Sequence, residues 1–174
     1  MARGARRMSR FLCIASLLAL LCAAACATPR KSDPGAVADA YAEAGRWDEA
    51  AREIELAVRA HPRDVELRRR AARIQAGAGH VSQAIDHLEV AIQIAPTDPG
   101  TWIQLGDLEN GRENVADAYV AYRRAAELAP EDIRAVSGLA LTADSLGFDE
   151  EARLAYARWA ELERQHDAEG PRQD

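Results

Sequence analysis

The sequence predicts an all-α fold, a solenoid of about four helix-turn-helix pairs, because the same residue types return at a fixed spacing. Alanines recur every 34 residues, at Ala50, Ala84, Ala118 and Ala152. Prolines recur at the same interval, at Pro62, Pro96 and Pro130. A period of this length is typical of repeat proteins, in which each unit buries its apolar face by stacking on its neighbours. We therefore expect a stack of helical pairs that binds other proteins.

The chain begins with the pattern of a secretory signal peptide, which we assign to residues 1–25. An uncharged apolar run extends from Phe11 to Ala25 and is preceded by four arginines, Arg3, Arg6, Arg7 and Arg10. A charged start, a short apolar run and a small-residue exit are the three parts of such a peptide. At about 15 residues the run is shorter than the roughly 20 that a membrane-spanning helix needs.

All the cysteines of the chain lie near this segment, at Cys13, Cys22 and Cys26. The sequence Ala-Ala-Ala-Cys that ends at Cys26 resembles the lipobox of bacterial lipoproteins. This resemblance implies lipidation of Cys26, with residues 26–32 as the lipidated N-terminus and a short linker. Lipoproteins of this type carry several acyl chains, and stable membrane anchoring needs at least two. The alternative is ordinary cleavage at an Ala-x-Ala site, which leaves Cys26 in the removed peptide or as a free thiol.

The helices that follow have recognisable starts and breaks. Asp33-Pro34 and Asp98-Pro99 each place a capping aspartate before proline, at the first helical position, where proline is tolerated. Asp64 and Asp132 are predicted to cap two further helices. The two helices of each pair are predicted to be separated near Gly45, Gly79, Gly111 and Gly147.

The best-defined helix is predicted between Val81 and Ile94, where apolar residues follow the i, i+3, i+4, i+7 spacing of an amphipathic helix. His87 belongs to this segment, and we expect it on the solvated face. The central core is predicted to contain Trp102, Leu105, Tyr119, Tyr122 and Leu128.

The repeated residues resemble the tetratricopeptide repeat. The third copy matches that motif best, with Trp102, Leu105-Gly106, Ala118, Tyr122, Ala125 and Pro130. The resemblance implies a right-handed superhelix and a domain of four repeats over residues 33–166. Residues 167–174 are polar, contain Gly170-Pro171 and are predicted to form a disordered tail.

The charge balance limits the kinds of partner. Removal of residues 1–25 takes four arginines and no acidic residue from the 22 basic and 28 acidic residues, which leaves 18 basic residues and a net charge of −10. Such a chain is not expected to bind nucleic acid, and anionic lipid is not expected to be its main ligand. Its membrane contact is expected to occur through the lipid anchor.

The sequence shows no arrangement typical of an enzyme. The four histidines, at positions 61, 80, 87 and 166, lack metal-ligand spacing, and there is no glycine-rich phosphate loop or activated nucleophile. We therefore expect a protein that is not an enzyme and that uses no metal, cofactor or small-molecule substrate.

The resemblance also implies a concave groove lined by the first helix of each pair. Some tetratricopeptide proteins hold the C-terminal carboxylate of a peptide there with basic and amide side chains. The corresponding residues in this chain are Arg69, Arg73, Gln104 and Arg134, whereas a fifth place holds Gly138. Arg69 and Arg73 are i, i+4 and could present two guanidinium groups to one carboxylate. The alternative is that these arginines are ordinary solvated surface residues.

Trp159 is a second candidate site, because it replaces the small residue found at Ala125 in the third copy. It either folds back onto Tyr156 and Leu139 or forms an exposed surface for self-association or a partner.

Two functional hypotheses follow. The first is a non-catalytic adaptor, anchored as a lipoprotein on the periplasmic face of the outer membrane, that assists assembly of an envelope, pilus or secretion complex. Ala27 after Cys26 favours the outer membrane under the sorting rule of some such lipoproteins. The second is a soluble periplasmic or secreted module that oligomerises or regulates an envelope enzyme. The fate of Cys26 distinguishes them.

Overall fold

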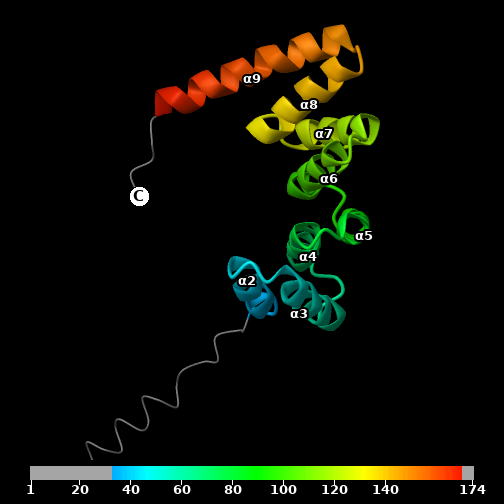
Figure 1. Cartoon of the computed structure of the whole chain (residues 1–174). Helices are drawn as coiled ribbons and strands as arrows, with labels where there is room; N and C mark the ends of the chain where they lie inside the picture. The colour runs from blue at the N-terminus through cyan, green and yellow to red at the C-terminus, as the bar shows by residue number, and fades with distance from the viewer. Residues whose placement is uncertain (1–32, 170–174) are drawn as a thin grey trace, which may run out of the picture. The chain divides into compact units, whose positions relative to one another are not determined.

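The described part of the chain is entirely helical. The computed structural model describes residues 33–169, and its helices belong to one compact unit that begins at Pro34. In chain order they are α2 (Ala36–Glu43), α3 (Trp47–Ala60), α4 (Val65–Gly77), α5 (Val81–Ile94), α6 (Pro99–Gly111), α7 (Val115–Leu128), α8 (Ile133–Ser145) and α9 (Asp149–Glu169). No strand occurs between residues 33 and 169, and the predicted all-α fold is confirmed (Figure 1).

Several predictions concern residues outside this range. The signal peptide at residues 1–25, the lipidation site Cys26, the linker up to residue 32 and the tail beyond residue 169 all lie outside the described residues. The domain boundary predicted at His166 lies within α9, which continues to Glu169.

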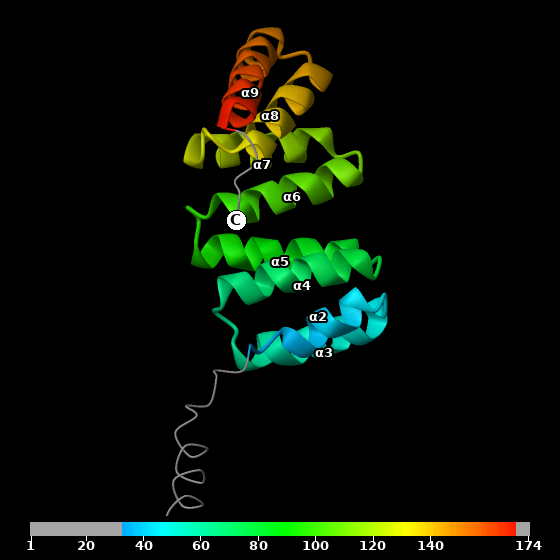
Figure 2. The same cartoon turned by 90° about the vertical axis from the view of Figure 1, so that its left-hand side faces the viewer.

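The helices stack pair upon pair in the order of the sequence (Figure 2). The backbones of the first helices, α2, α4, α6 and α8, each come close to that of the next first helix. The backbones of the second helices, α3, α5, α7 and α9, lie farther apart, and contacts between these helices are made by long side chains. The first helices therefore form the more tightly spaced inner layer, whose free surface we call the inner face. The second helices form the outer layer, which leaves wider seams between neighbouring pairs.

Three inner helices begin at the aspartates that the sequence predicts as caps. The side chains of Asp64 and Asp98 accept the amide N–H of Leu67 and Thr101, each at 3.0 Å. Asp132 caps α8 in the same way, and Pro99 occupies the first turn of α6. Each cap satisfies an amide group that the helix itself leaves unpaired.

The cap predicted for the first helix is wrong. Helix α2 begins at Ala36 with Gly35 at the N-cap position and without a side-chain cap, so Asp33 and Pro34 precede it. Tertiary packing supplies most helix stability in proteins. The first turn of α2 has no earlier described repeat against which to pack, and the helix is correspondingly short.

Each turn inside a pair contains one residue in the left-handed region. These residues are Gly45, Gly79, Glu113 and Gly147, with φ values of 72°, 82°, 63° and 75°. The separation predicted near Gly111 is confirmed, because α6 ends at Gly111 and α7 begins at Val115, but the left-handed residue of this turn is Glu113. In all four turns the residue after the left-handed one donates its backbone N–H to the carbonyl five residues earlier. Phe148 N–H, for example, donates to the Ala143 carbonyl at 2.9 Å. This is the hydrogen bond of a Schellman cap.

The periodic alanines lie in the core, as expected. Ala50, Ala84 and Ala118 are fully buried and Ala152 is 3% exposed. Small side chains at these places let the helices approach closely.

The predicted central core is only partly correct. Tyr119 and Tyr122 are buried, whereas Trp102, Leu105 and Leu128 are half-buried. The Trp102 ring packs against the edge of the core while its Nε1–H donates to the Pro96 carbonyl at 3.0 Å. Ile103, which is 2% exposed, fills the interior place instead.

Tyr122 enters a space that two glycines leave open. A Cβ atom would lie 2.8 Å from the Tyr122 ring at Gly106 and 2.5 Å from it at Gly138, both shorter than van der Waals contact. The tyrosine therefore packs against the backbones of α6 and α8 together. Gly138, which departs from the basic residue of the groove pattern, has a packing role here.

Candidate functional site

The inner face contains a pocket of about 360 Å³ between α4, α6 and α8. Its lining residues are Ala72, Arg73, Ala76, Leu88, Gln104, Asp107, Leu108 and Arg134. Three of the four groove residues predicted from the sequence, Arg73, Gln104 and Arg134, are therefore brought to one cavity. Asp107, another lining residue, lies one 34-residue period after Arg73, so these two residues occupy the same place in successive repeats.

The floor of this pocket is apolar and part of the core. Ala72 and Leu88 are buried, and Ala76 and Leu108 pack against them as half-buried residues. The small side chains of the two alanines on α4 leave room above Leu88. A ligand can therefore place an apolar group on the floor while its polar atoms meet the rim.

The rim carries two guanidinium groups that reach solvent. The side chains of Arg73 and Arg134 are 59% and 66% exposed. Arg73 Nη2 lies 3.5 Å from Asp39 Oδ1, and Arg134 Nη2 lies 2.5 Å from Asp107 Oδ2. Exposed ion pairs of this kind contribute about 0–1 kcal/mol each. A ligand carboxylate can therefore replace either acid at little energetic cost.

Asp107 is also held from below by Tyr122, whose hydroxyl donates to Oδ1 at 2.7 Å. Burial of the phenol, followed by its hydrogen bond to Asp107, raises the pKa of Tyr122 well above its usual range. The phenol therefore stays protonated at neutral pH and keeps the carboxylate in position between α6 and α8.

Gln104 provides the neutral part of the site. Its Oε1 atom is buried and has no hydrogen-bond partner among the described residues. An unpaired buried acceptor is costly, of the order of 1–3 kcal/mol. A ligand N–H group, such as that of a peptide backbone, would satisfy it once the amide turns into the pocket.

Arg69 does not join this site. Its side chain is 27% exposed, and Nη1 lies 3.1 Å from Glu66 and 3.8 Å from Asp98, the cap of α6. The guanidinium group lies against Gly100, where a Cβ atom would be 2.6 Å from Nη2. Arg69 therefore packs on the start of α6, and the structure does not present it together with Arg73 to one ligand.

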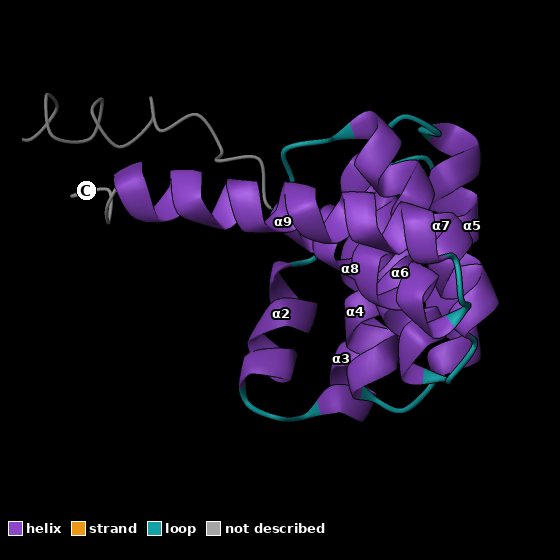
Figure 3. Ribbon diagram, turned by 90° about the horizontal axis from the view of Figure 1, so that it is seen from above, coloured by secondary structure: helices purple, strands orange, loops and turns teal. Residues whose placement is uncertain are grey.

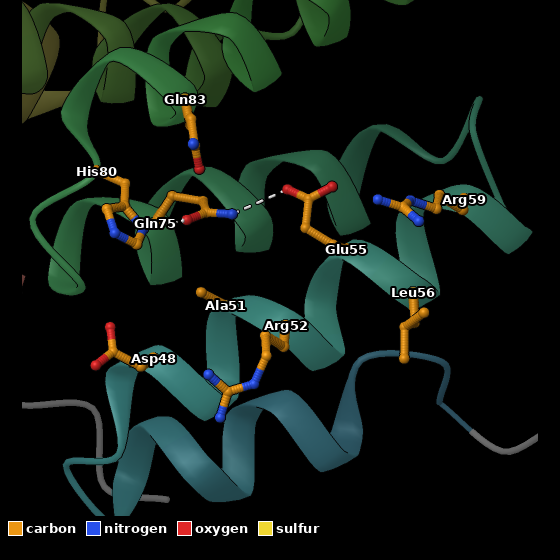
Figure 4. A pocket seen from close by; sticks show the side chains of 9 residues that line it. All are labelled: Asp48, Ala51, Arg52, Glu55, Leu56, Arg59, Gln75, His80 and Gln83. Carbon is orange, nitrogen blue, oxygen red and sulfur yellow. Dashed lines mark hydrogen bonds between the residues drawn. The ribbon is translucent and has the colours of Figure 1, made fainter.

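A second cavity, of about 500 Å³, lies in the outer seam between the first two pairs. It is lined by residues of α3 and of the α4–α5 region, shown in Figure 4: Asp48, Ala51, Arg52, Glu55, Leu56, Arg59, Gln75, His80 and Gln83. At its base Gln75 Nε2 donates to Glu55 Oε1 at 2.9 Å, and His80 Nδ1 lies 3.0 Å from Gln75 Oε1.

His87 belongs to the same network, and its predicted position is wrong. It is 9% exposed, and its Nε2 lies 2.7 Å from Glu55 Oε1. Its partner is 32 residues earlier, so no local pattern reveals the contact. The 34-residue period could have revealed that His87 is buried, because alanines, Ala121 and Ala155, occupy its place in the two later repeats and are also buried. The network links α3, α4 and α5.

The candidate interface residue Trp159 lies at the end of the stack. Its ring stacks on Tyr156, with centroids 6.2 Å apart and planes inclined by 22°, and its Nε1–H donates to Glu163 at 2.8 Å. The tryptophan is half-buried.

The geometry of stacked helical pairs agrees with the family comparison. Residues 41–105, which extend from α2 into α6, match the tetratricopeptide repeat family. The fold is a tetratricopeptide-repeat solenoid. A search of curated proteins finds no match.

Solved structures of MamA share this tetratricopeptide-repeat fold. One crystal structure of MamA is 24% identical with a TM-score of 0.67, covering 72% of this chain and 74% of that chain. The MamA RS-1 ArsTM double mutant is 23% identical with a TM-score of 0.69, covering 79% of both chains. Another MamA crystal structure is 19% identical with a TM-score of 0.66, covering 79% and 75%. At these identities the likeness concerns the fold.

Within residues 33–169 the tetratricopeptide-repeat unit contains no helix long and apolar enough to cross a membrane. The same residues contain no group of three or more histidine, cysteine, aspartate or glutamate side chains arranged to hold a metal ion.

Proposed function

We propose that this protein is a non-catalytic adaptor whose inner face holds a carboxylate-bearing peptide segment of a protein partner. Tetratricopeptide-repeat folds are protein-interaction modules, and the observation that carries the finer proposal is the shared pocket of Arg73, Gln104 and Arg134. Two solvent-exposed guanidinium groups match a carboxylate, because each can donate two parallel hydrogen bonds.

The other parts of the pocket suit a peptide. The unpaired Oε1 of Gln104 can accept a backbone N–H, and the floor of Leu88 and Leu108 can receive an apolar side chain. Asp39 and Asp107 pair with these arginines until a ligand carboxylate replaces them. The negative net charge of the chain as a whole disfavours ligands of high negative charge, such as nucleic acid.

The binding test compares peptides that end in a free carboxylate with the same peptides carrying an amidated end. Charge-assisted hydrogen bonds contribute about 1.5–3 kcal/mol, so amidation should weaken binding by roughly tenfold or more. The double variant Arg73→Ala/Arg134→Ala should bind both forms equally weakly. The matched control, Arg52→Ala/Arg124→Ala, removes two arginines of the outer helices and should bind as the unmodified chain does. Equal binding of free and amidated peptides by the unmodified chain would refute the carboxylate site.

A photo-crosslinking residue in place of Gln104 tests the same site in cells. It should capture a protein partner, and the Arg73→Ala/Arg134→Ala changes should abolish the capture. The same residue in place of Val120, which is 50% exposed on the outer helix α7, provides the background. Capture that is equal at both places would contradict binding at the inner face.

We further propose that the adaptor works on the periplasmic face of the outer membrane, held by a lipid on Cys26, and assists assembly of an envelope, pilus or secretion complex. The support is the arginine-led apolar run and the lipobox-like sequence, both outside the described residues. Cys26→Ser should move the protein from the membrane fraction to the soluble fraction and abolish fatty-acid labelling. If the unmodified protein is already soluble and unlabelled, it is a soluble periplasmic or secreted module instead.

A further inference from the structure

The first pair of the stack has an uncovered face. Val37 and Ala40 of α2 occupy the same places in the repeat as Ala71 and Ile74 of α4, which are completely buried. Ala71 and Ile74 share a cluster with α3, the second helix of the preceding pair. Val37, in contrast, is 57% exposed. The face of α2 that a preceding pair would cover is therefore bare in the described residues.

This face is shaped as a shallow groove rather than a flat surface. It has a volume of about 400 Å³ and is lined by Ala36, Val37, Ala40, Tyr41, Ala44 and Arg46. Most of its lining side chains are small, as they are along the seams inside the stack.

The last pair has the opposite uncovered surface. Tyr156 of α9 occupies the same place as Tyr122, which is 5% exposed and packs against the following helix α8 at Gly138. Trp159 occupies the same place as Ala125, which is completely buried. Tyr156 and Trp159 are both half-buried, and no further helix follows α9 in the described range. The second half of α9 projects beyond the other helices (Figure 3).

We propose that the chain associates head to tail, with the Tyr156–Trp159 surface of one copy seated on the α2 face of the next. The two surfaces are the two halves of the junction that the chain already makes three times, between α3 and α4, α5 and α6, and α7 and α8. Across the last of these, the Tyr122 ring rests on Gly138. Three periods earlier, the place of Gly138 is held by Ala36, whose Cβ requires Tyr156 to lie farther from the α2 backbone of the next copy than Tyr122 lies from Gly138.

One pair of oppositely charged residues, Arg153 and Glu49, falls in the same register at the two surfaces. Inside the stack Tyr119 donates a hydrogen bond to Glu151 at 2.6 Å across the α7–α9 seam. At the free end Arg153 stands in the place of Tyr119, and in the next copy Glu49 stands in the place of Glu151. Between residues 33 and 169 of the single chain, each of these two residues pairs within its own segment, Arg153 with Glu150 at 2.6 Å and Glu49 with Arg46 at 2.8 Å. In the same register Arg46 takes the place of Phe148, whose ring centroid lies 5.1 Å from that of Tyr119 inside the stack. Association therefore brings Arg153 opposite the Arg46–Glu49 pair, where it can share Glu49 with Arg46.

A contact between two different surfaces of the same chain does not close on itself unless the rotation forms a ring. Copies therefore add one after another, and the average mass rises with concentration. Sedimentation of the full-length chain should show this rise at concentrations up to about 1 mM, a range that includes weak specific interfaces. A chain that stays monomeric throughout this range overturns the proposal.

Two blocked variants identify the surfaces. Val37→Glu places a charge on the α2 face, and Trp159→Glu places one on the α9 surface. Each variant alone should be monomeric. An equal mixture should form a dimer and nothing larger, because the Val37→Glu variant keeps its α9 surface and the Trp159→Glu variant keeps its α2 face. Val120→Glu, on the exposed outer surface of α7, should associate as the unmodified chain does.

Other outcomes overturn the head-to-tail contact. If one blocked variant still associates alone, the interface joins two like surfaces, and if the mixture stays monomeric, the two surfaces do not meet. If the chain associates through the apolar run at residues 11–25, every variant should associate to the same extent, and this result also overturns the head-to-tail contact. If Trp159→Glu lowers helicity, Arg153→Glu replaces it, since Arg153 is 66% exposed. Its loss of association should be restored by Glu49→Arg in the same chain, and failure of that rescue contradicts the proposed register.

Discussion

Replacing Glu113 by glycine should stabilise the protein, because Glu113 is held in a backbone conformation that suits glycine. Its φ is 63°, and the same place in the other three repeats holds Gly45, Gly79 and Gly147. A residue with a side chain pays roughly 1–2 kcal/mol in this region. Glycine in turn loses about 0.5–1 kcal/mol through the greater freedom of the unfolded chain. The difference predicts a gain of about 1 kcal/mol for Glu113→Gly.

The assay is urea unfolding followed by circular dichroism, in which the midpoint should rise while the slope stays constant. A gain of 1 kcal/mol corresponds to an increase of about 4 °C in the thermal midpoint of a domain of this size. Glu113→Gln is the matched control, because it removes the charge near the end of α6 but keeps the left-handed backbone. The mirror change, Gly79→Ala, should lower the unfolding free energy by about 1 kcal/mol. If the glycine and glutamine variants of residue 113 are equally stable, the backbone argument is wrong.

Further substitutions test the packing and the site. Ile103→Ala should lower the free energy of unfolding in urea by about 2–5 kcal/mol. Trp102→Ala should lower it by less than the roughly 3–5 kcal/mol that truncation of a fully buried aromatic residue costs. Gly138→Ala should lower it by about 1–3 kcal/mol through overpacking against Tyr122, and adding Tyr122→Leu should recover part of the loss. The raised pKa of Tyr122 means that unfolding releases its proton above about pH 10, so stability is present below that pH and falls above it. Tyr122→Phe should therefore make the decline of unfolding free energy between about pH 9 and about pH 11 shallower, and an unchanged decline would contradict this reasoning.

The features that the sequence predicted correctly are local or periodic. Asp64, Asp98 and Asp132 cap their helices through contacts two or three residues away, which a short pattern records. The alanine period marks the buried seams, because every internal junction repeats the same packing. Asp33 fails as a cap since α2, unlike the inner helices, has no preceding pair in the described residues.

The errors involve contacts that no local pattern contains. His87 was placed on the solvated face because its own helix is amphipathic, yet Glu55 of α3 covers it. In the predicted groove, Arg73, Gln104 and Arg134 converge, whereas Arg69 lies against the backbone of Gly100 at the start of α6. The spacing of Arg69 and Arg73 predicts one helix face, but it does not show that the next pair occupies half of that face.

The inner face differs from the core in how the repeats vary. At the core places the residue type is nearly constant, as with the periodic alanines. At one inner-face place the four repeats carry Asp39, Arg73, Asp107 and Leu141 in turn, and Asp39 and Arg73 lie 3.5 Å apart. Packing does not require this variation, because these residues are exposed or half-buried. In the proposed binding at the inner face, this series of acid, base, acid and leucine is the part of the chain that discriminates between partners. It favours an extended segment with a carboxylate opposite Arg73 and an apolar side chain opposite Leu141.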